Sequence, residues 1–180
     1  MINRIVILLC LVIIGFSSCN SRKDRINKQL IELYSNTIVI PFSDMDTLIV
    51  DTTYLSNSIN YQLLVYIDSS ECTLCFASHH QEWEFVLMES RKYEPNLTLT
   101  IIIDSKSVSE EIKEKFLRSD FPKSVFIDKK GTFRKKNPVF PESAIMHVLL
   151  LDKNNKVILV GNPLNNKKIE ELLYSKLRKP

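Results

Sequence analysis

The segment LLVYIDSSECTLC, residues 63–75, decides the fold, because an apolar run ends in a polar turn and leads directly into two cysteines. The run from Leu63 to Ile67 has the length and composition of a buried strand. From Phe76 to Ser90, apolar residues recur at helical spacing on one face. This pattern predicts a single helix that starts at Cys72 and stops before Pro95.

Apolar runs on both sides extend this unit into an α/β domain. Upstream, the spacing of Ile26, Leu30 and Leu33 predicts a helix. The remaining expected elements are strands at 37–40, 48–50, 97–103 and 125–127, a helix with capping-box spacing from Ser107 to Glu110, a hairpin of 148–151 and 157–160, and a closing helix over 169–177. The central strand-helix alternation predicts parallel strands with right-handed crossovers, and the hairpin adds an antiparallel pair.

The N-terminus has the pattern of an export signal, with Arg4 as its positive flank and an apolar run from Ile5 to Phe16. About 12 residues give roughly 18 Å of helix, which is too short for a hydrocarbon core of about 30 Å. Residues 16–19, Phe-Ser-Ser-Cys, resemble the bacterial lipobox. This resemblance implies removal of a lipoprotein signal peptide, residues 1–18, and lipid attachment at Cys19. The alternative is an ordinary secretory signal with an incidental cysteine.

The rest of the chain has the size of one domain, with an expected tether at 19–27 and a domain at 28–180 whose core is about 60–179. The 24 basic and 21 acidic residues are nearly balanced and form no basic tract, so no nucleic-acid partner is expected. We expect an extracytoplasmic protein anchored through Cys19 to a bacterial membrane. The outer membrane is favoured, because no Asp of the inner-membrane retention kind follows Cys19.

Four cysteines are present, but only two are available for chemistry in the mature protein. Cys10 leaves with the signal, and Cys19 is consumed by lipid. Cys72 and Cys75 remain, in an oxidising compartment where a disulfide persists.

The order strand, Cys-x-x-Cys, helix, followed by βαβ and a closing ββα, resembles the thioredoxin superfamily over about residues 60–179. Within it, the chain is most similar to the TlpA/ResA-like periplasmic and lipoprotein thioredoxins, whose "strand, Asp, basic, turn" segments resemble Val125–Gly131 and Val148–Gly161. The resemblance implies a thioredoxin-like fold with a central mixed sheet flanked by helices. It also implies a thiol-disulfide oxidoreductase acting on protein thiols and disulfides, with an unspecified electron donor. The redox-active cysteine pair replaces any other cofactor.

The expected roles of the two cysteines follow from their place at a helix start. The attacking species is a thiolate, which free amide N–H groups at a helix N-terminus stabilise. We therefore predict that Cys72 attacks and that Cys75, a turn further in and against the core, resolves the mixed disulfide. A purely structural disulfide is the alternative, although so small a loop contributes only about 2 kcal/mol.

Three positions depart from the pattern of redox thioredoxins. Where these often carry Trp before the first cysteine, an acid inside the first strand and a cis-proline, this chain has Glu71, Tyr66 and Met146. Glu71 opposes thiolate formation at Cys72 and favours a reducing poise. Asp68 is close enough to the pair to accept a proton. Glu71, Asp68 and Met146 are therefore expected to modulate the pair.

Two other functions stay open on the sequence. Cys72, Cys75 and His79, with His147 as a fourth ligand, are a candidate copper or zinc site. A non-catalytic binding module on a thioredoxin scaffold is the other possibility. Haem attachment at this motif is excluded, because Phe76 occupies the position where histidine is required.

Overall fold

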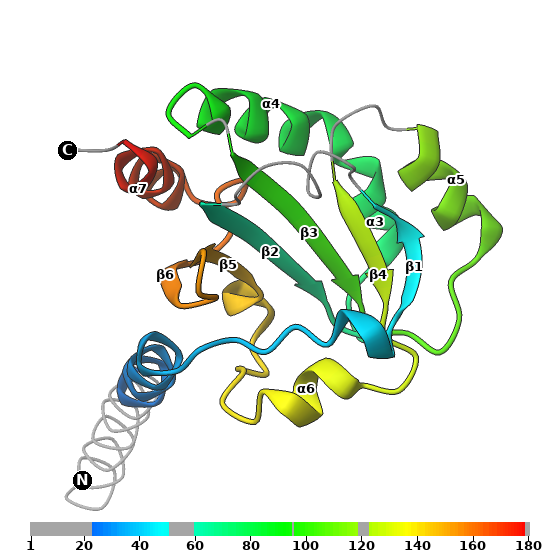
Figure 1. Ribbon diagram of the computed structural model, residues 1–180, viewed down its shortest axis with the longest axis horizontal. Coiled ribbons are helices and arrows are strands. Elements are labelled where there is room, and N and C mark those ends of the chain that lie inside the picture. Colours follow the sequence, from blue (N-terminus) through cyan, green and yellow to red (C-terminus); the bar gives the residue numbers. More distant parts are fainter. Residues whose placement is uncertain (1–22, 51–59, 95, 119–122, 179–180) are drawn as a thin grey trace, which may run out of the picture.

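A computed structural model of the protein describes residues 23–50, 60–94, 96–118 and 123–178. Within these ranges, strands form one six-stranded sheet in the order β1-β4-β3-β2-β5-β6 (Figure 1). The strands are β1 (Asp46–Ile49), β2 (Tyr61–Ile67), β3 (Leu97–Ile103), β4 (Ser124–Ile127), β5 (Val148–Asp152) and β6 (Val157–Val160). The central strands β2, β3 and β4 are parallel, and β1, β5 and β6 each run antiparallel to their neighbours.

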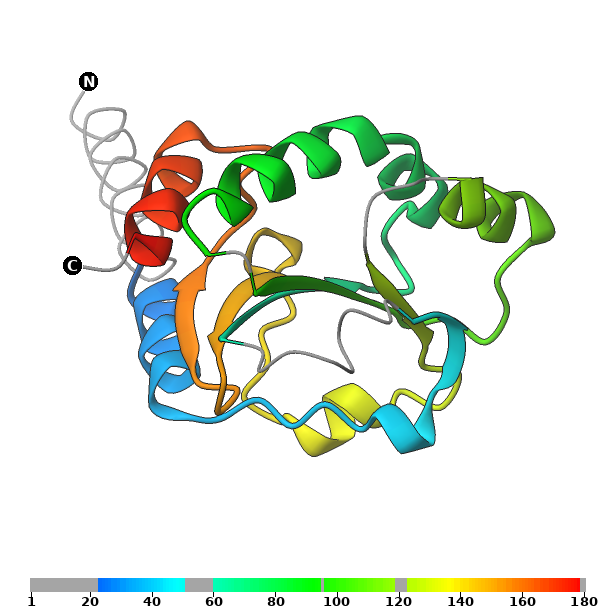
Figure 2. The same cartoon turned by 45° about the horizontal axis from the view of Figure 1, so that its top comes forward.

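Helices cover both faces of the sheet (Figure 2). One face is covered by α3 (Thr73–Ser78), α4 (His80–Arg91), α5 (Glu110–Arg118) and α7 (Lys167–Leu177). The other is covered by α6 (Thr132–Lys136) and the short η1 (Phe42–Asp44), while η2 (Ala144–Met146) leads into β5. A helix at residues 23–35 lies beside β5 and β6. The arrangement is a mixed sheet between two helical layers.

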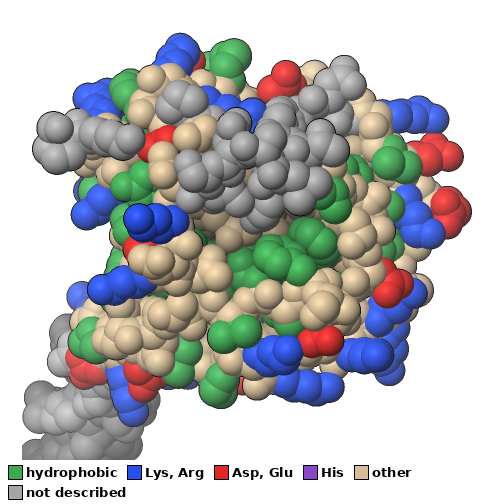
Figure 3. All heavy atoms as spheres, viewed as in Figure 1, with side chains coloured by type: hydrophobic (Ala, Val, Ile, Leu, Met, Phe, Trp, Pro, Cys, Tyr) green, Lys and Arg blue, Asp and Glu red, His purple; other side chains and the backbone are tan. Residues whose placement is uncertain are grey.

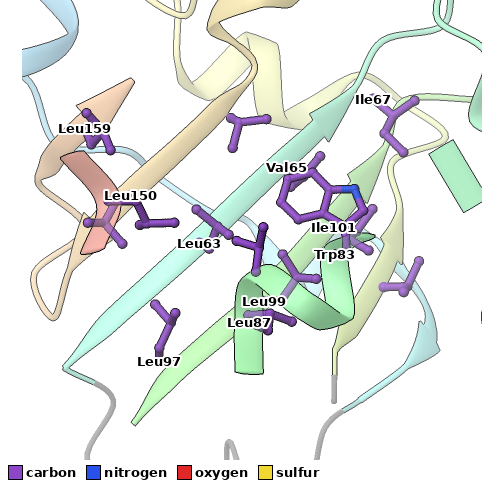
Figure 4. Close-up of a cluster of buried hydrophobic side chains, with 14 of the residues drawn as sticks. Leu63, Val65, Ile67, Trp83, Leu87, Leu97, Leu99, Ile101, Leu150 and Leu159 are labelled. Carbon is purple, nitrogen blue, oxygen red and sulfur yellow. The ribbon is translucent and has the colours of Figure 1, made fainter. Parts of the chain in front are cut away.

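The alternation of side chains along β2 divides the core in two. Leu63, Val65 and Ile67 face the layer of α3, α4, α5 and α7, while Leu64 and Tyr66 face the layer of α6. Trp83 of α4, 1% exposed, lies over β2 and β3 beside Val65 (Figure 4). Because both faces of the two strands are covered, residues 63–67 of β2 and 101–103 of β3 are continuous apolar runs, and Thr98 and Thr100 of β3 are buried as well.

On the face seen in Figure 3, hydrophobic side chains are exposed at the centre and also among the charged side chains of the rim. In the view of Figure 1, hydrophobic side chains gather in a hollow near the centre of the face, and Lys, Arg, Asp and Glu side chains surround it. Several of these charges pair across elements, such as Lys136 with Asp44 at 2.8 Å.

The strand order and the flanking helices confirm the predicted thioredoxin-like fold. The strands predicted at 63–67, 97–103 and 125–127 are present, as are the hairpin and the closing helix. The strand predicted at 48–50 corresponds to β1, which starts two residues earlier, at Asp46.

The strand predicted at 37–40 is wrong, because a side chain takes the place of a partner strand. The Asn137 amide accepts the Val39 N–H and donates to the Val39 carbonyl, each at 2.8 Å. Only Thr37 makes a bridge, with Lys156. The apolar run therefore packs against the sheet without joining it there.

Two helix starts also differ from expectation. The first helix already includes residue 23, the first described residue, inside the stretch expected to be a tether. At the start of α5, the Ser109 hydroxyl accepts the Ile112 N–H, so the capping serine is not Ser107. The predicted signal peptide and Cys19 lie outside the described residues. No helix within the described ranges is long and apolar enough to cross a membrane.

Candidate functional site

Cys72 and Cys75 form a disulfide at the start of α3, with Cα atoms 5.2 Å apart. Cys72 is the N-cap residue of this helix, and its Sγ accepts the Cys75 N–H at 3.1 Å. A sulfur that already receives an amide N–H is placed to carry negative charge when the disulfide is reduced. Both cysteines are exposed to solvent.

The exposure of Cys75 corrects the prediction that it lies inward against the core. Residues three apart on a helix share a face, and the disulfide ties Cys75 to the exposed Cys72. The buried residue of α3 is Ala77 instead. Both cysteine residues are therefore exposed to a partner.

The prediction of a single helix after Cys72 is also wrong, because the helical conformation is interrupted at His79, between α3 and α4. His79 has φ −91° and ψ 30°, and its N–H donates to the Phe76 carbonyl three residues back. The hydrophobic periodicity continues across the break because Ala77 and Trp83 both face the same core. Cys75 consequently lies on a separate helix of six residues, of which Cys72 is the N-cap.

The turn between β2 and Cys72 is closed by reciprocal hydrogen bonds between Asp68 and Glu71. The Glu71 N–H donates to the Asp68 carbonyl at 2.9 Å, and the Asp68 N–H donates to Glu71 Oε2 at 2.8 Å. Asp68 Oδ1 also accepts the N–H and the hydroxyl of Ser70, both at 2.9 Å. These contacts fix the backbone immediately before the first cysteine.

Arg134 of α6 joins this turn to the sheet, a role that the sequence did not reveal. Its Nη2 donates to Asp68 Oδ2 at 2.7 Å, its Nε to the Tyr66 hydroxyl at 3.0 Å and its Nη1 to the Pro141 carbonyl at 3.3 Å. The guanidinium also lies over the Tyr66 ring, 5.0 Å from its centroid. In the sequence, Arg134 stands among the basic residues Lys135 and Lys136, and nothing distinguishes it from them.

A carboxylate and a glycine place α6 so that Arg134 reaches the turn. Asp128 Oδ1 and Oδ2 accept the N–H groups of Thr132 and Phe133 at 2.9 and 2.7 Å. Gly131 has φ 61°, a left-handed conformation that glycine adopts without strain. Asp128 therefore holds the turn between β4 and α6.

The electrostatics of Asp68 make it a poor proton acceptor. Burial raises its pKa, but the hydrogen bonds from Ser70 and Arg134 outweigh burial and lower the pKa to about 2. At neutral pH the carboxylate is ionised and committed to these donors. Its role is to hold the turn, which differs from the proton transfer considered from the sequence.

Tyr66 occupies the strand position where an acid was expected in redox thioredoxins. Its hydroxyl donates to Asp104 Oδ2 at 2.5 Å and accepts from Arg134. Burial, followed by the hydrogen bond to Asp104, raises the pKa of Tyr66. The hydroxyl therefore remains protonated and links β2 to the residue that follows β3.

His147 lies behind Glu71 and is 2% exposed. Its Nδ1 is 2.8 Å from Glu71 Oε2, and its Nε2 is 3.1 Å from the Pro141 carbonyl. The ring stacks on Phe140, with centroids 5.3 Å apart. The neighbouring Met146, at the expected cis-proline position, is buried in the core cluster that contains Tyr66.

The structure brings Cys72, Cys75, Glu71, Asp68 and His147 to one end of the sheet, but it does not assemble the proposed metal site. His79 is exposed and contacts Glu82 at 3.1 Å. His147 contacts Glu71 instead of a cysteine. Among the described residues, no group of three His, Cys, Asp or Glu side chains is arranged to hold a metal ion.

Comparisons with known proteins find similarity in solved structures. A thioredoxin-like protein from Bacteroides caccae is 24% identical, with a TM-score of 0.43, over 67% of this chain and 41% of that one. A thioredoxin-like protein from Porphyromonas gingivalis is 19% identical, with a TM-score of 0.47, over 79% of this chain and 92% of that one. The N-terminal domain of PilB from N. meningitidis, in its reduced form, is 17% identical, with a TM-score of 0.48, over 79% and 97%.

No protein-family model matches the sequence, and a search of curated proteins finds no match. The described residues nevertheless define a thioredoxin-like domain by their own topology. It carries a solvent-exposed disulfide at the start of a helix. A pair in this position is capable of redox chemistry.

Proposed function

We propose that this protein is a membrane-anchored thiol-disulfide oxidoreductase that exchanges the Cys72–Cys75 disulfide with protein thiols outside the cytoplasm, on the reducing side. The observation that carries the proposal is the exposed disulfide whose first sulfur accepts an amide N–H at the start of α3. A buried staple would need neither solvent access nor a donor aimed at sulfur.

The proposed cycle starts from the reduced pair. The Cys72 thiolate attacks one sulfur of a substrate disulfide, so that a Cys72–substrate bond forms and the other substrate sulfur leaves as a thiolate. Cys75 then loses its proton, attacks Cys72 Sγ and expels the second substrate thiolate. Two electrons pass to the substrate, and the Cys72–Cys75 disulfide is regenerated. A dithiol protein must reduce it again by the same exchange in reverse.

Anchoring completes the proposal and rests on the sequence. The lipobox-like residues 16–19 supply Cys19 for lipid, and an extracytoplasmic location provides the disulfide substrates. Several acyl chains on one cysteine give stable membrane attachment, where a single chain would be marginal.

Equilibration with glutathione tests the redox function directly. The protein is incubated in buffers of graded glutathione and glutathione-disulfide ratio, and the reduced fraction is counted by thiol alkylation. The proposal expects one two-electron transition that Cys72→Ser abolishes, with a potential nearer about −270 mV than about −120 mV. A pair that does not exchange with glutathione would instead favour a non-catalytic binding module.

A further inference from the structure

We propose that His147 is a positioning residue, which holds the Glu71 carboxylate in the turn before Cys72 and thereby favours the Cys72 thiolate. The inference rests on the proposed thiol-disulfide chemistry and goes beyond it by assigning control of the nucleophile to a buried residue between η2 and β5. His147 stands 76 positions away from Glu71 in the chain.

The contact is made on a single carboxylate oxygen. Glu71 Oε2 receives the Asp68 N–H at 2.8 Å and faces His147 Nδ1, also at 2.8 Å. The Asp68 N–H holds the carboxylate against the 68–71 turn, and His147 holds it near the start of β5. An oxygen with two donors has much of its charge satisfied locally.

Glu71 Oε2 accepts a hydrogen bond from His147 Nδ1–H in either protonation state that has hydrogen on Nδ1. In the neutral ring, Nε2 is an acceptor for Arg134 Nη2, 3.4 Å away. In the doubly protonated ring, Nε2 donates to the Pro141 carbonyl at 3.1 Å. The link to Glu71 is the same in both, so the inference does not depend on the charge of His147.

The surroundings leave the ring one orientation. Phe140 stacks on it and Tyr66 packs edge-on, both with centroids 5.3 Å away. The charged groups that face it are Glu71 from the turn and Arg134 from α6. Asp68 and the Tyr66 hydroxyl act on it through Arg134. A ring held in this way can position a carboxylate.

The consequence for Cys72 follows from charge. A mobile carboxylate one residue before the nucleophile opposes thiolate formation. A carboxylate held by two donors opposes it less. Loss of the His147 donor should therefore raise the thiol pKa of Cys72, and only because Glu71 is present.

Two nearly isosteric variants separate this role from simple packing. In His147→Asn the amide nitrogen can take the place of Nδ1 and keep the donor to Glu71, whereas in His147→Gln it reaches the place of Nε2. The readout is the pH dependence of Cys72 alkylation in the reduced full chain, with Trp83 fluorescence and the midpoint of thermal unfolding checking the fold. His80→Gln is the matched control.

We expect His147→Gln to slow alkylation of Cys72 at pH 6 by about threefold to tenfold, as a rise of up to about one unit in its thiol pKa requires. His147→Asn should remain within about twofold of the parent, as should His80→Gln. In a Glu71→Gln background, the further change His147→Gln should have no effect, because the charge that it releases is gone.

Three outcomes would overturn the inference: equal effects of the Asn and Gln variants, no effect of either, or an effect of His147→Gln that persists without Glu71. The first would mean that packing matters, and the last that His147 acts on Cys72 directly. Each differs from failure of the proposed function, in which the parent pair itself would not exchange with glutathione. If both His147 variants unfold, Glu71→Gln alone should still speed alkylation at pH 6, and no change there would also overturn the inference.

Discussion

The Tyr66 hydroxyl donates to the Asp104 carboxylate across two neighbouring parallel strands, with Oη and Oδ2 2.5 Å apart. The acid that redox thioredoxins often carry inside the first strand is thus replaced here by a tyrosine that reaches an acid beyond the end of the next strand. Arg134 binds the same hydroxyl, so one oxygen joins β2, β3 and α6. The strand end that leads into the cysteine turn is fixed from two sides.

Tyr66→Phe should lower the free energy of unfolding by about 1–2 kcal/mol, because Asp104 and Arg134 each lose a partner while the ring packing stays. Denaturant unfolding followed by Trp83 fluorescence measures the loss. Tyr34→Phe is the control, since Tyr34 is 39% exposed, and it should change stability by less than about 0.5 kcal/mol. Equal stabilities for both variants would show that the Tyr66 hydroxyl contributes nothing net.

Arg134→Met should destabilise the protein by about 2–3 kcal/mol, because it leaves the Asp68 carboxylate without its charged donor at a site where both side chains are about three-quarters covered. A double-mutant cycle with Asp68→Asn isolates the pair and should give a coupling of about 0.5–3 kcal/mol. Lys135→Met is the matched control on the same helix. If the two single effects simply add, Asp68 and Arg134 do not stabilise each other.

The pH dependence of stability should report Asp68. Its folded pKa, about 2, lies below the unfolded value of about 3.9, so its contribution is present above about pH 4 and is lost as pH falls toward 2. The stability difference between the parent and Asp68→Asn should therefore shrink over that interval. Urea unfolding at pH 2 to 6 measures it, and a constant difference would contradict the lowered pKa.

Cys75→Ser should accumulate mixed disulfides with partner proteins through Cys72, because no internal thiol remains to release them. Cys72→Ser should trap little, because Cys72 is the sulfur that accepts the Cys75 N–H. Non-reducing gels of the two variants, purified from cells, give the comparison. Equal trapping by the two variants would refute the assignment of roles. Because both cysteines are exposed, a partner can reach either of them, and the comparison therefore tests the assignment.

Cys19→Ser should release the protein from membranes or leave the precursor uncleaved, because lipid attachment needs the cysteine of residues 16–19. Fractionation of cells and the mass of the protein decide between these outcomes. A Ser variant that is still processed and membrane-bound would rule out the lipoprotein proposal.

The central strands could be predicted because burial on both faces leaves an unmistakable apolar run. Residues 63–67 are wholly apolar, and residues 97–103 combine leucine and isoleucine with the β-branched Thr98 and Thr100, so both are recognised as strands without knowledge of their neighbours. Residues 37–40 have the same composition, but the amide of Asn137, about 100 positions later, occupies their backbone groups. No local pattern reports such a distant partner.

The cysteine pair could also be predicted, since its spacing and position are local. The contacts among Asp68, Glu71, Arg134 and His147 could not be predicted. Arg134 stands in a basic run, and Glu71 was interpreted only by its adjacency to Cys72, whereas its carboxylate contacts His147. The helix interruption at His79 could not be predicted from periodicity, because Ala77 before it and Trp83 after it face the same core. Pairings between residues far apart in the chain determine the site, and periodicity carries no information about them.

The helix at residues 23–35 limits how far the domain would reach under the proposed lipid anchoring at Cys19. Residue 23 is four positions after Cys19, and four residue steps span at most about 14 Å. A domain of about 150 residues is roughly 40 Å across. With lipid on Cys19, the segment between the lipid and the first described helix is shorter than the diameter of the domain, so the domain cannot move far from the membrane. Under the proposed anchoring, its working zone would be a thin layer against the bilayer, and a soluble partner would have to come to that layer to exchange electrons.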